Sequence, residues 1–470
     1  MPHDAPLSSP PRIAIIGGGF SGAAVALNLL RKLPAGAASI ILVEPRNLLG
    51  GGVAYSSTDP AHRLNVPATR MLLLCEEPGA FEAWFKSSGA LAEDPEALLE
   101  DGRIYPRRAA FGKYVDGALR EAAAAPGALS FRHMQAKAET VHPVGSGFRI
   151  ATEDGGLLEA DLLVLAVSHP PPGVPQRLAP IAGHQKFIGN PWAQDALGRI
   201  GRQDRVLIIG TALSTADVIA SLKAQGHQGK ILAVSRRGLV SRVRKMAQAE
   251  PFGDFTADPP SSAVELLRRT RRVIAQAEAS GSSWGAVIDG MRIQGLTLWS
   301  ALPPAEKSRV LRHLRTFWDV HRYQVAPQLA SITEAECAAG ALDIRAARIE
   351  SGRLDGERME VELKFRGEDP AWEAFDAVVN CTGPDHGRVI ATNKALASLN
   401  QAGLIEPDAF GFGLQTDLTA RALNAGGTAH PNLFVAGPLA RAAFGELMGL
   451  PQVSQHAALV ADDIRKALES

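Results

Sequence analysis

A glycine-rich turn lies between an apolar run and a helical segment near the start of this chain. Residues 12–16 (RIAII) form a β-branched apolar run, GGGFSG follows, and residues 23–33 have the composition and length of a helix. A second apolar run at 39–45 completes a βαβ unit of about 30 residues. This order of strand, glycine turn and helix predicts an α/β fold in which a dinucleotide binds at the turn.

We call this unit of strand, glycine turn and helix the first cradle. Each of its glycines has its own role in the predicted site. Gly17 permits the tight turn, Gly19 lets a diphosphate approach the backbone, and Gly22 lets the helix pack on the strand. Glu44 lies near the end of the second run, where its carboxylate can accept a hydrogen bond from a ribose hydroxyl. Four neighbouring residues are assigned to the same site: Phe20, Ser21, Pro45 and Arg46. A plain glycine turn is the alternative interpretation. It is disfavoured because the strand, the helix and the acidic residue all occur at the spacing of a dinucleotide-binding unit.

A second unit of the same kind begins at residue 205 with RVLIIG, a helical segment and the run KILAVSRRG. Gly210 keeps the first glycine, whereas Ala212 and Thr215 replace the other two. The second run ends in arginines in place of an acid, and a guanidinium pairs with the 2′-phosphate of NADP, so NADPH is favoured over NADH. The residues assigned to this second cradle are Gly210, Ser214, Ser235, Arg236 and Arg237. A degenerate, empty domain with two solvated arginines is the alternative.

An FAD-binding protein needs more contacts than one cradle supplies, and three strand ends offer them. Small residues follow apolar runs at 166–168, 381–384 and 436–439, and open α/β sheets bind ligands at such ends. The residues assigned there are Thr382, Gly383, Gly437 and Pro438. The loop at 50–71 offers glycines and donors for a flat ligand, and the residues assigned in it are Gly52, Asn65, Arg70 and Met71. Simple turns and an Ω-type surface loop are the alternatives, and for His62 the surface loop is preferred.

Composition and cysteine usage exclude several other classes of protein. The chain has 470 residues with 49 Lys+Arg against 49 Asp+Glu, so no broad field attracts nucleic acid or an anionic membrane. Cys75, Cys337 and Cys381 are scattered, which suits a reducing compartment and gives neither a zinc cluster nor the Cys-x-x-Cys pair of a disulfide reductase. No apolar run reaches the ~20 residues that span a bilayer, and the N-terminus lacks the pattern of a signal peptide. We therefore expect a cytoplasmic protein without metal, nucleic-acid or membrane partners.

The order of these motifs resembles a known family. GGGFSG, the 50–71 loop, VLIIGTALSTAD, SRRGL, FWDVHRYQVAP, VVNCTGP and LFVAGPL occur in the order seen in the bacterial FAD-NAD(P)-binding protein family. That family belongs to the two-dinucleotide-binding-domain flavoproteins and is similar in layout to flavin-containing and N-hydroxylating monooxygenases. The resemblance covers nearly the whole chain. It implies that the first unit binds the ADP half of FAD, that the 50–71 loop runs beside the isoalloxazine, and that Gly437 lies near the ribityl chain.

These observations predict an α/β protein with two Rossmann-like dinucleotide-binding domains and a helical extension. Residues 11–200 and 335–470 are expected to form a discontinuous FAD domain, and 201–334 an inserted NADPH domain that includes the helical segment 261–330. We expect an FAD-dependent oxidoreductase that uses NADPH, specifically a monooxygenase of a small nucleophilic substrate such as an amine, with molecular oxygen as a partner. A flavin oxidase or reductase, or a sensor or partner protein without turnover, is the alternative. No catalytic residue is assigned, and the substrate and the oligomeric state are not predicted.

The helical segment offers two further expectations. Trp284 and Trp299 are candidates for substrate walls, with core packing as the alternative. His321 could move a proton, but it shares a helical face with Leu314, Phe317 and Trp318, which favours a packed structural histidine.

Overall fold

The computed structural model describes residues 10–167, 169–243 and 250–469. The chain forms two compact units, the first of residues 1–56, 68–170 and 386–470, the second of residues 57–67 and 171–385. These boundaries differ from the predicted ones, since 57–67, 171–200 and 335–385 belong to the second unit. Which residues bind which cofactor stays a prediction.

The first unit is built on a six-stranded sheet, and its strands in spatial order are β15 (Arg421–Leu423), β16 (Ala429–Val435), β7 (Leu162–Leu165), β1 (Arg12–Ile16), β2 (Ser39–Val43) and β3 (Ser130–Met134). Every neighbouring pair is parallel except β15 and β16. The strands β1 and β7 are buried along nearly their whole length, as a parallel sheet covered on both faces requires. The predicted strands at 12–16 and 39–45 are therefore confirmed, with β2 ending at Val43.

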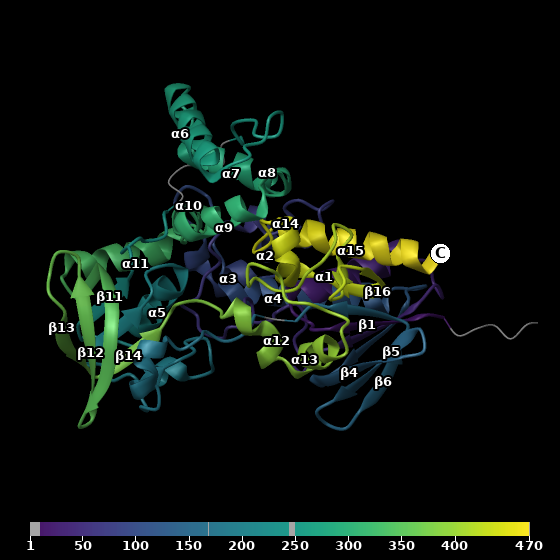
Figure 1. The fold of residues 1–470 in the computed structure, drawn as a ribbon, viewed down its shortest axis with the longest axis horizontal. Helices are drawn as coiled ribbons and strands as arrows, with labels where there is room; N and C mark the ends of the chain where they lie inside the picture. The colour runs from purple at the N-terminus through teal and green to yellow at the C-terminus, as the bar shows by residue number, and fades with distance from the viewer. Residues whose placement is uncertain (1–9, 168, 244–249, 470) are drawn as a thin grey trace, which may run out of the picture. The chain divides into compact units, whose positions relative to one another are not determined.

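Helices pack on this sheet, and the first of them, α1 (Phe20–Lys32), is buried from Phe20 to Leu30 except for Ser21. It contacts α4 (Arg108–Ala124) and α15 (Gln452–Glu469), which lies beside it in Figure 1. The other helices of the first unit are α2 (Ala80–Ser87), α3 (Ala90–Glu93), α12 (Val389–Thr392), α13 (Lys394–Gln401), α14 (Arg441–Phe444) and the 3₁₀ segments η1 (Ala68–Arg70), η2 (Pro95–Ala97), η5 (His386–Arg388) and η6 (Gly437–Ala440).

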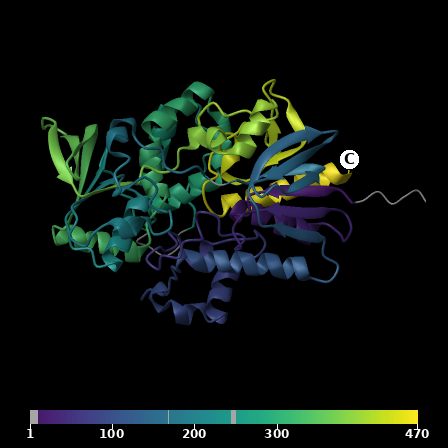
Figure 2. The same cartoon turned by 90° about the horizontal axis from the view of Figure 1, so that it is seen from below.

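A separate antiparallel sheet of the first unit contains β4 (Ala138–Val144), β5 (Gly147–Thr152) and β6 (Leu157–Ala160), drawn in blue beside the purple strands in Figure 2. The apolar run 157–167 is divided at Asp161. Asp161 accepts a hydrogen bond from the Arg12 backbone N–H at 2.7 Å. The chain before Asp161 pairs with β5, whereas the chain after it forms β7 of the parallel sheet.

The second unit is built on a seven-stranded sheet, and its strands in spatial order are β13 (Ala371–Phe375), β12 (Arg358–Phe365), β11 (Leu342–Asp355), β10 (Ile231–Ser235), β9 (Val206–Ile209), β14 (Ala377–Asn380) and β8 (Phe187–Ile188). The pairs of β12 with β11 and β13 are antiparallel, and the others are parallel. Alternate residues of β9 enter different apolar clusters, Val206 and Ile208 in one, Leu207 and Ile209 in the other. This alternation indicates that both faces of the sheet are covered.

The second unit also contains helices α5 (Leu213–Ala224) and α11 (Pro327–Ala338), the 3₁₀ segments η3 (Gln176–Ile181) and η4 (Ala196–Arg199), and a helical extension of α6 (Ala263–Ala279), α7 (Trp284–Ile293), α8 (Gly295–Ala301), α9 (Pro304–His313) and α10 (Arg315–Arg322). Figure 1 shows α6, α7 and α8 gathered in one group. The extension has an apolar cluster of its own, centred on Phe255, Val273, Val287 and Met291. Among the described residues, no helix has the length and apolar character needed to cross a membrane.

Candidate functional site

The first candidate site lies at the turn between β1 and α1. Gly17 has a φ of +102°, and a Cβ there would lie 2.4 Å from the Ala166 carbonyl oxygen, so a side chain is excluded both by the backbone conformation and by the residue that follows β7. Gly19 is the N-cap residue of α1 and has no side chain to cap it. The first N–H groups of α1 therefore face the carboxyl end of the sheet without an intrahelical partner, which is the arrangement that binds a diphosphate.

The loop at 50–52 lies directly on this turn. A Cβ on Gly52 would lie 3.1 Å from the Gly19 Cα, and a Cβ on Gly19 would lie 3.3 Å from the Gly52 Cα. The two backbones therefore approach each other as closely as the absence of side chains allows. The structure thus brings together Gly19 and Gly52, which the sequence assigns to the same cofactor from different motifs.

Glu44 anchors the turn from the end of β2. Its side chain is buried, and Oε2 accepts a hydrogen bond from the Gly18 N–H at 2.9 Å. Oε1 accepts from the Arg46 N–H at 3.1 Å and from Arg46 Nη1 at 3.0 Å. The carboxylate therefore holds both the glycine turn and the chain after β2, and its remaining lone pairs are those that could accept from a ribose hydroxyl.

The end of β16 meets the same turn. Gly437 lies so close to α1 that a Cβ there would stand 2.1 Å from the Ser21 Oγ. Pro438 follows as the first residue after it in η6. Two residues that the sequence assigns separately, Ser21 and Gly437, are therefore neighbours at the carboxyl edge of the first sheet.

A buried histidine supports this strand end, and sequence reasoning missed it. His456 on α15 is 3% exposed, and its Nδ1 accepts a hydrogen bond from the Gly437 N–H at 3.2 Å. Burial lowers the pKa of His456 to about 3, so the ring is neutral and its proton is on Nε2. In the described part of the chain Nε2 has no hydrogen-bond partner. No local pattern marks this histidine, because its position follows from the packing of α15 on β16.

The 50–71 loop is divided between the units. Arg70 and Met71 belong to the first unit, whereas Asn65 belongs to the second. His62 is buried in the second unit, where its Nδ1 contacts the Ser57 Oγ at 2.7 Å and its Nε2 contacts the Ser221 Oγ of α5 at 3.1 Å. This histidine therefore fastens the loop to α5 and is not the exposed loop residue that the sequence suggests.

Thr382 and Gly383 also lie in the second unit, because β14 pairs with β9 and β8. The Thr382 hydroxyl donates to the Asn380 Oδ1 at 2.8 Å, which holds the chain after β14. Both residues stand at the carboxyl edge of the second sheet. The sequence-based expectation groups them with the first cradle, and their role toward a cofactor stays a prediction.

The second cradle repeats the first at the end of β9. Gly210 has a φ of +124°, and a Cβ there would lie 2.4 Å from the Cys381 carbonyl oxygen. Ala212 is the N-cap residue of α5. A cavity of ≈ 80 Å³ lies at this helix end, lined by residues that include Thr211, Ala212 and Ser241. The Ser241 Oγ is buried, and the described residues offer it no partner. Sequence reasoning missed Ser241, which no pattern distinguishes from a surface serine.

The predicted site residues at the end of β10 differ in their contacts and in their exposure. The Ser235 Oγ contacts the Thr211 Oγ1 at 2.9 Å and accepts from the Gly238 N–H at 3.0 Å, so it holds the turn. Arg236 and Arg237 are both exposed, and the Arg237 guanidinium lies over the Phe317 ring, 4.7 Å from its centroid. Arg236 is therefore the more accessible cation for a 2′-phosphate, while Ser214 lies half-buried in the first turn of α5.

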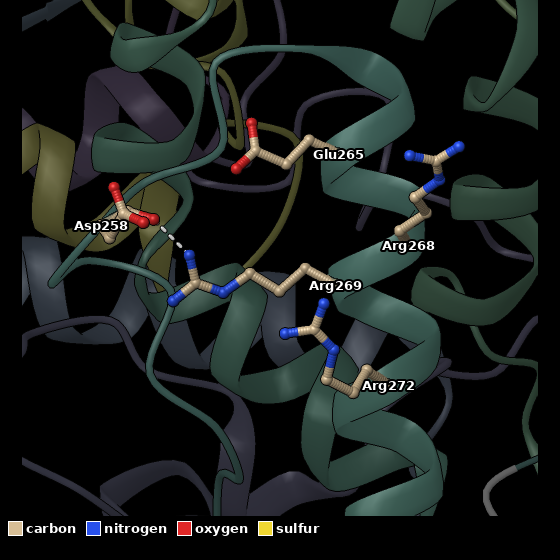
Figure 3. A pocket seen from close by; sticks show the side chains of 5 residues that line it. All are labelled: Asp258, Glu265, Arg268, Arg269 and Arg272. Carbon is tan, nitrogen blue, oxygen red and sulfur yellow. Dashed lines mark hydrogen bonds between the residues drawn. The ribbon is translucent and has the colours of Figure 1, made fainter.

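The helical extension carries a hollow of ≈ 410 Å³ on α6, lined by Asp258, Glu265, Arg268, Arg269 and Arg272. Figure 3 shows the Arg269 guanidinium reaching across to Asp258, while Arg268 and Arg272 extend from the same helix. Arg269 donates to the backbone carbonyls of Asp258 and Asp254. The arginine that spans this hollow thus fastens a loop to α6.

The aromatic residues of the extension are packed against neighbours. Trp284 meets the His321 ring edge-on with 5.1 Å between centroids, and the His321 Nδ1 contacts the Phe317 carbonyl oxygen at 2.7 Å. This agrees with the expected structural histidine. Lys307 lies over the Trp299 ring, 5.2 Å from its centroid. These contacts favour packing over a substrate wall for both tryptophans.

Comparison with known proteins agrees with this geometry. Residues 14–170 match a protein-family model described as FAD-NAD(P)-binding, which confirms the predicted family resemblance for the segment that contains the first cradle. No curated protein matches the chain.

Solved structures resemble the chain over almost its full length. The reduced ornithine hydroxylase of Pseudomonas aeruginosa has 15% sequence identity and a TM-score of 0.63, covering 98% of this chain and 100% of that one. The L-lysine 6-monooxygenase of Pseudomonas syringae has 19% identity and a TM-score of 0.60, covering 98% and 99%. The FAD-bound cadaverine monooxygenase of Erwinia amylovora has 13% identity and a TM-score of 0.61, covering 97% and 94%. The chain therefore shares the fold of these three proteins, and the predicted α/β fold is confirmed.

Proposed function

We propose that this protein is an FAD-dependent monooxygenase that uses NADPH and acts on a small amine. The observation that carries the proposal is the presence of two strand, glycine-turn and helix cradles in one chain, at Gly17 and at Gly210. Its fold is shared with proteins described as ornithine, lysine and cadaverine hydroxylases or monooxygenases. We further propose a cytoplasmic location, which three unpaired cysteines suit.

The first cradle fits FAD. The backbone space at Gly19 and Gly52 would be filled by any Cβ, and the first N–H groups of α1 are available to a diphosphate. Glu44 would accept from the ribose, and the Gly437 region would follow the ribityl chain. The neutral His456 offers a buried N–H donor beside that strand end.

The second cradle fits a nicotinamide nucleotide less completely. Ala212 adds a methyl group where a glycine would allow closer approach, and the cavity at the start of α5 is small. The buried Ser241 hydroxyl and the exposed Arg236 are the groups that support NADPH binding there. When bound, the two cofactors would supply the electrons and the oxygen chemistry, while this chain binds, orients and shields them.

The buried Cys381 is not suited to disulfide reduction. Cys75, Cys337 and Cys381 form no disulfide, and burial raises the pKa of the Cys381 thiol to about 12. A group that stays protonated at neutral pH is a poor nucleophile toward a disulfide. A flavin oxidase or a cofactor-binding protein without turnover remains the competing function.

The test is the coupling of NADPH consumption to product. Purified FAD-loaded protein is incubated in air with NADPH and, in separate reactions, ornithine, lysine and cadaverine as probe amines. We expect one of them to give hydroxylated product in amounts close to the NADPH consumed. Hydrogen peroxide equal to the NADPH consumed, with no product from any amine, would identify an oxidase, and no NADPH consumption would leave a binding protein.

A further inference from the structure

A buried arginine at the carboxyl edge of the first sheet has no acidic partner among the residues that the structure describes. Arg441 begins α14, four residues after Gly437, and is 6% exposed. Its Nε approaches the Gly445 carbonyl oxygen at 3.4 Å, and its guanidinium lies 4.7 Å from the Phe412 ring centroid. No ion pair joins it to a carboxylate among the described residues. Burying a guanidinium without a counter-charge is costly, so such a group is normally paired.

Another buried arginine of this chain is paired with a carboxylate, as is usual. Arg292 on α7 is 7% exposed and forms an ion pair with Asp289 at 3.2 Å. Arg441 is equally buried but meets an aromatic ring and one long backbone contact instead. The difference indicates that the counter-charge of Arg441 comes from outside the chain.

The surroundings of Arg441 define the kind of ligand. His169 follows β7, and burial, with the nearby Arg441 charge as a second cause, lowers the pKa of His169 to about 4. The His169 ring is therefore neutral and adds no second charge. His386 meets it edge-on, with 4.7 Å between ring centroids. One fixed positive charge, a neutral imidazole and aromatic walls suit a single planar anion, because a guanidinium pairs with two coplanar acceptors.

We propose that Arg441 and the nearby His169, against which His386 packs, bind a planar monoanion at the carboxyl edge of β7 and β16. Adjacent parallel strands end there, which is where open α/β sheets bind ligands. Two sources share this chemistry: the carboxylate of an organic substrate, and the N1–C2–O2 edge of reduced flavin. Binding of the reduced flavin rests on the proposed function, whereas binding of a carboxylate does not. If the ligand is a substrate carboxylate, the substrate class narrows to amines that also carry an acid.

The experiment compares Arg441→Met and Arg441→Lys with Arg421→Met as a matched control. Arg421 belongs to the same unit and also lies over a ring, 5.8 Å from the Phe434 centroid, but outside this cluster. The measurements are the midpoint potential of bound FAD, the affinity for acetate as a carboxylate probe, and the affinities for FAD and riboflavin. Arg441→Lys keeps the charge and serves if the methionine variant does not fold.

A lower flavin potential in Arg441→Met identifies the reduced-flavin edge, and an acetate affinity weakened about tenfold or more identifies a carboxylate. Arg441→Lys should lie between the wild type and Arg441→Met, and Arg421→Met should match the wild type. Unchanged potential and unchanged acetate affinity would overturn the proposal, as would an affinity loss for FAD without one for riboflavin, which points to the diphosphate. Calorimetric titration with acetate tests anion binding at Arg441 even in a protein that binds no FAD. A failure of the proposed function can therefore be distinguished from a failure of this proposal.

Discussion

At the scale of single residues, buried polar groups decide how the first cradle is held. Glu44 uses both carboxylate oxygens on the turn that it supports. His456 gives its only acceptor to Gly437. Neither residue is a spectator, because each replaces a hydrogen bond that water would otherwise supply to a buried backbone group.

Glu44→Gln should weaken the turn. The substitution removes the charge and places an amide N–H where one oxygen accepts, so either Gly18 or Arg46 loses its partner. We expect the unfolding free energy of the FAD-free protein to fall by ~1–3 kcal/mol, and FAD to bind more weakly. Urea unfolding and fluorescence titration with FAD measure the two effects. An unchanged unfolding curve would mean that these hydrogen bonds do not hold the turn.

The buried histidines should make the protein acid-sensitive. The folded pKa values of His456 and His169 are lowered to about 3 and about 4, from 6.5. As pH falls below 6.5 the unfolded chain takes up these protons and the folded chain does not, so stability is lost by ~1.4 kcal/mol per pH unit for each ring. This loss should be visible between pH 6.5 and 5.

His456→Gln separates this contribution from other acid effects. The glutamine can still accept from Gly437 but does not titrate. Its unfolding free energy should depend on pH less steeply than that of the wild type, by ~1.4 kcal/mol per unit in the same range. Equal slopes for the wild type and the variant would mean that the protonation of His456 does not contribute to the loss of stability between pH 6.5 and 5.

For the secondary-structure elements, individual strands and helices could be predicted from the sequence, whereas the pairing of the strands could not. The strands β1, β2, β9 and β10 and the helices α1 and α5 follow from apolar runs next to turn residues. The membership of β14 in the second sheet, and the division of the run at Asp161, depend on partners far along the chain. His62 shows the same limit, since its burial arises from a contact with Ser221 on α5.

The close approach of two backbones at the first turn can be tested with matched glycines. Gly52→Ala adds a methyl group 3.1 Å from the Gly19 Cα, whereas Gly79→Ala, also at positive φ, meets nothing within 4 Å. Both changes strain the backbone, so the difference between them isolates the contact. We expect FAD affinity to fall about tenfold for Gly52→Ala and to stay near the wild-type value for Gly79→Ala. Equal affinities in a fluorescence titration would contradict the placement of the cofactor.

The two arginines after β10 should differ. Arg236→Ala is expected to raise the KM for NADPH about tenfold and to leave the KM for NADH nearly unchanged, because only NADPH carries the 2′-phosphate. Arg237→Ala should have a smaller effect, since its guanidinium lies against Phe317. Steady-state kinetics with both nucleotides measure this. An equal rise for NADH and NADPH in Arg236→Ala would remove the basis for NADPH preference.

At the scale of the whole molecule, the sequence predicted the class of fold but not its division. Two cradles were recognisable because each is a local pattern of about 30 residues. The compact units differ from the expected domains because β11 to β14 complete the second sheet. Arg441, Ser241 and His456 were not predicted for a related reason, since the burial of a side chain depends on packing between distant parts of the chain.

We propose that electrons pass from NADPH, bound at the second cradle, to FAD, bound at the first. The direct measurement is the visible absorption of the FAD-loaded protein during anaerobic addition of NADPH, with NADH as the comparison. We predict that NADPH bleaches the flavin band and that NADH does so more slowly. A bound flavin whose spectrum NADPH leaves unchanged would contradict this electron transfer.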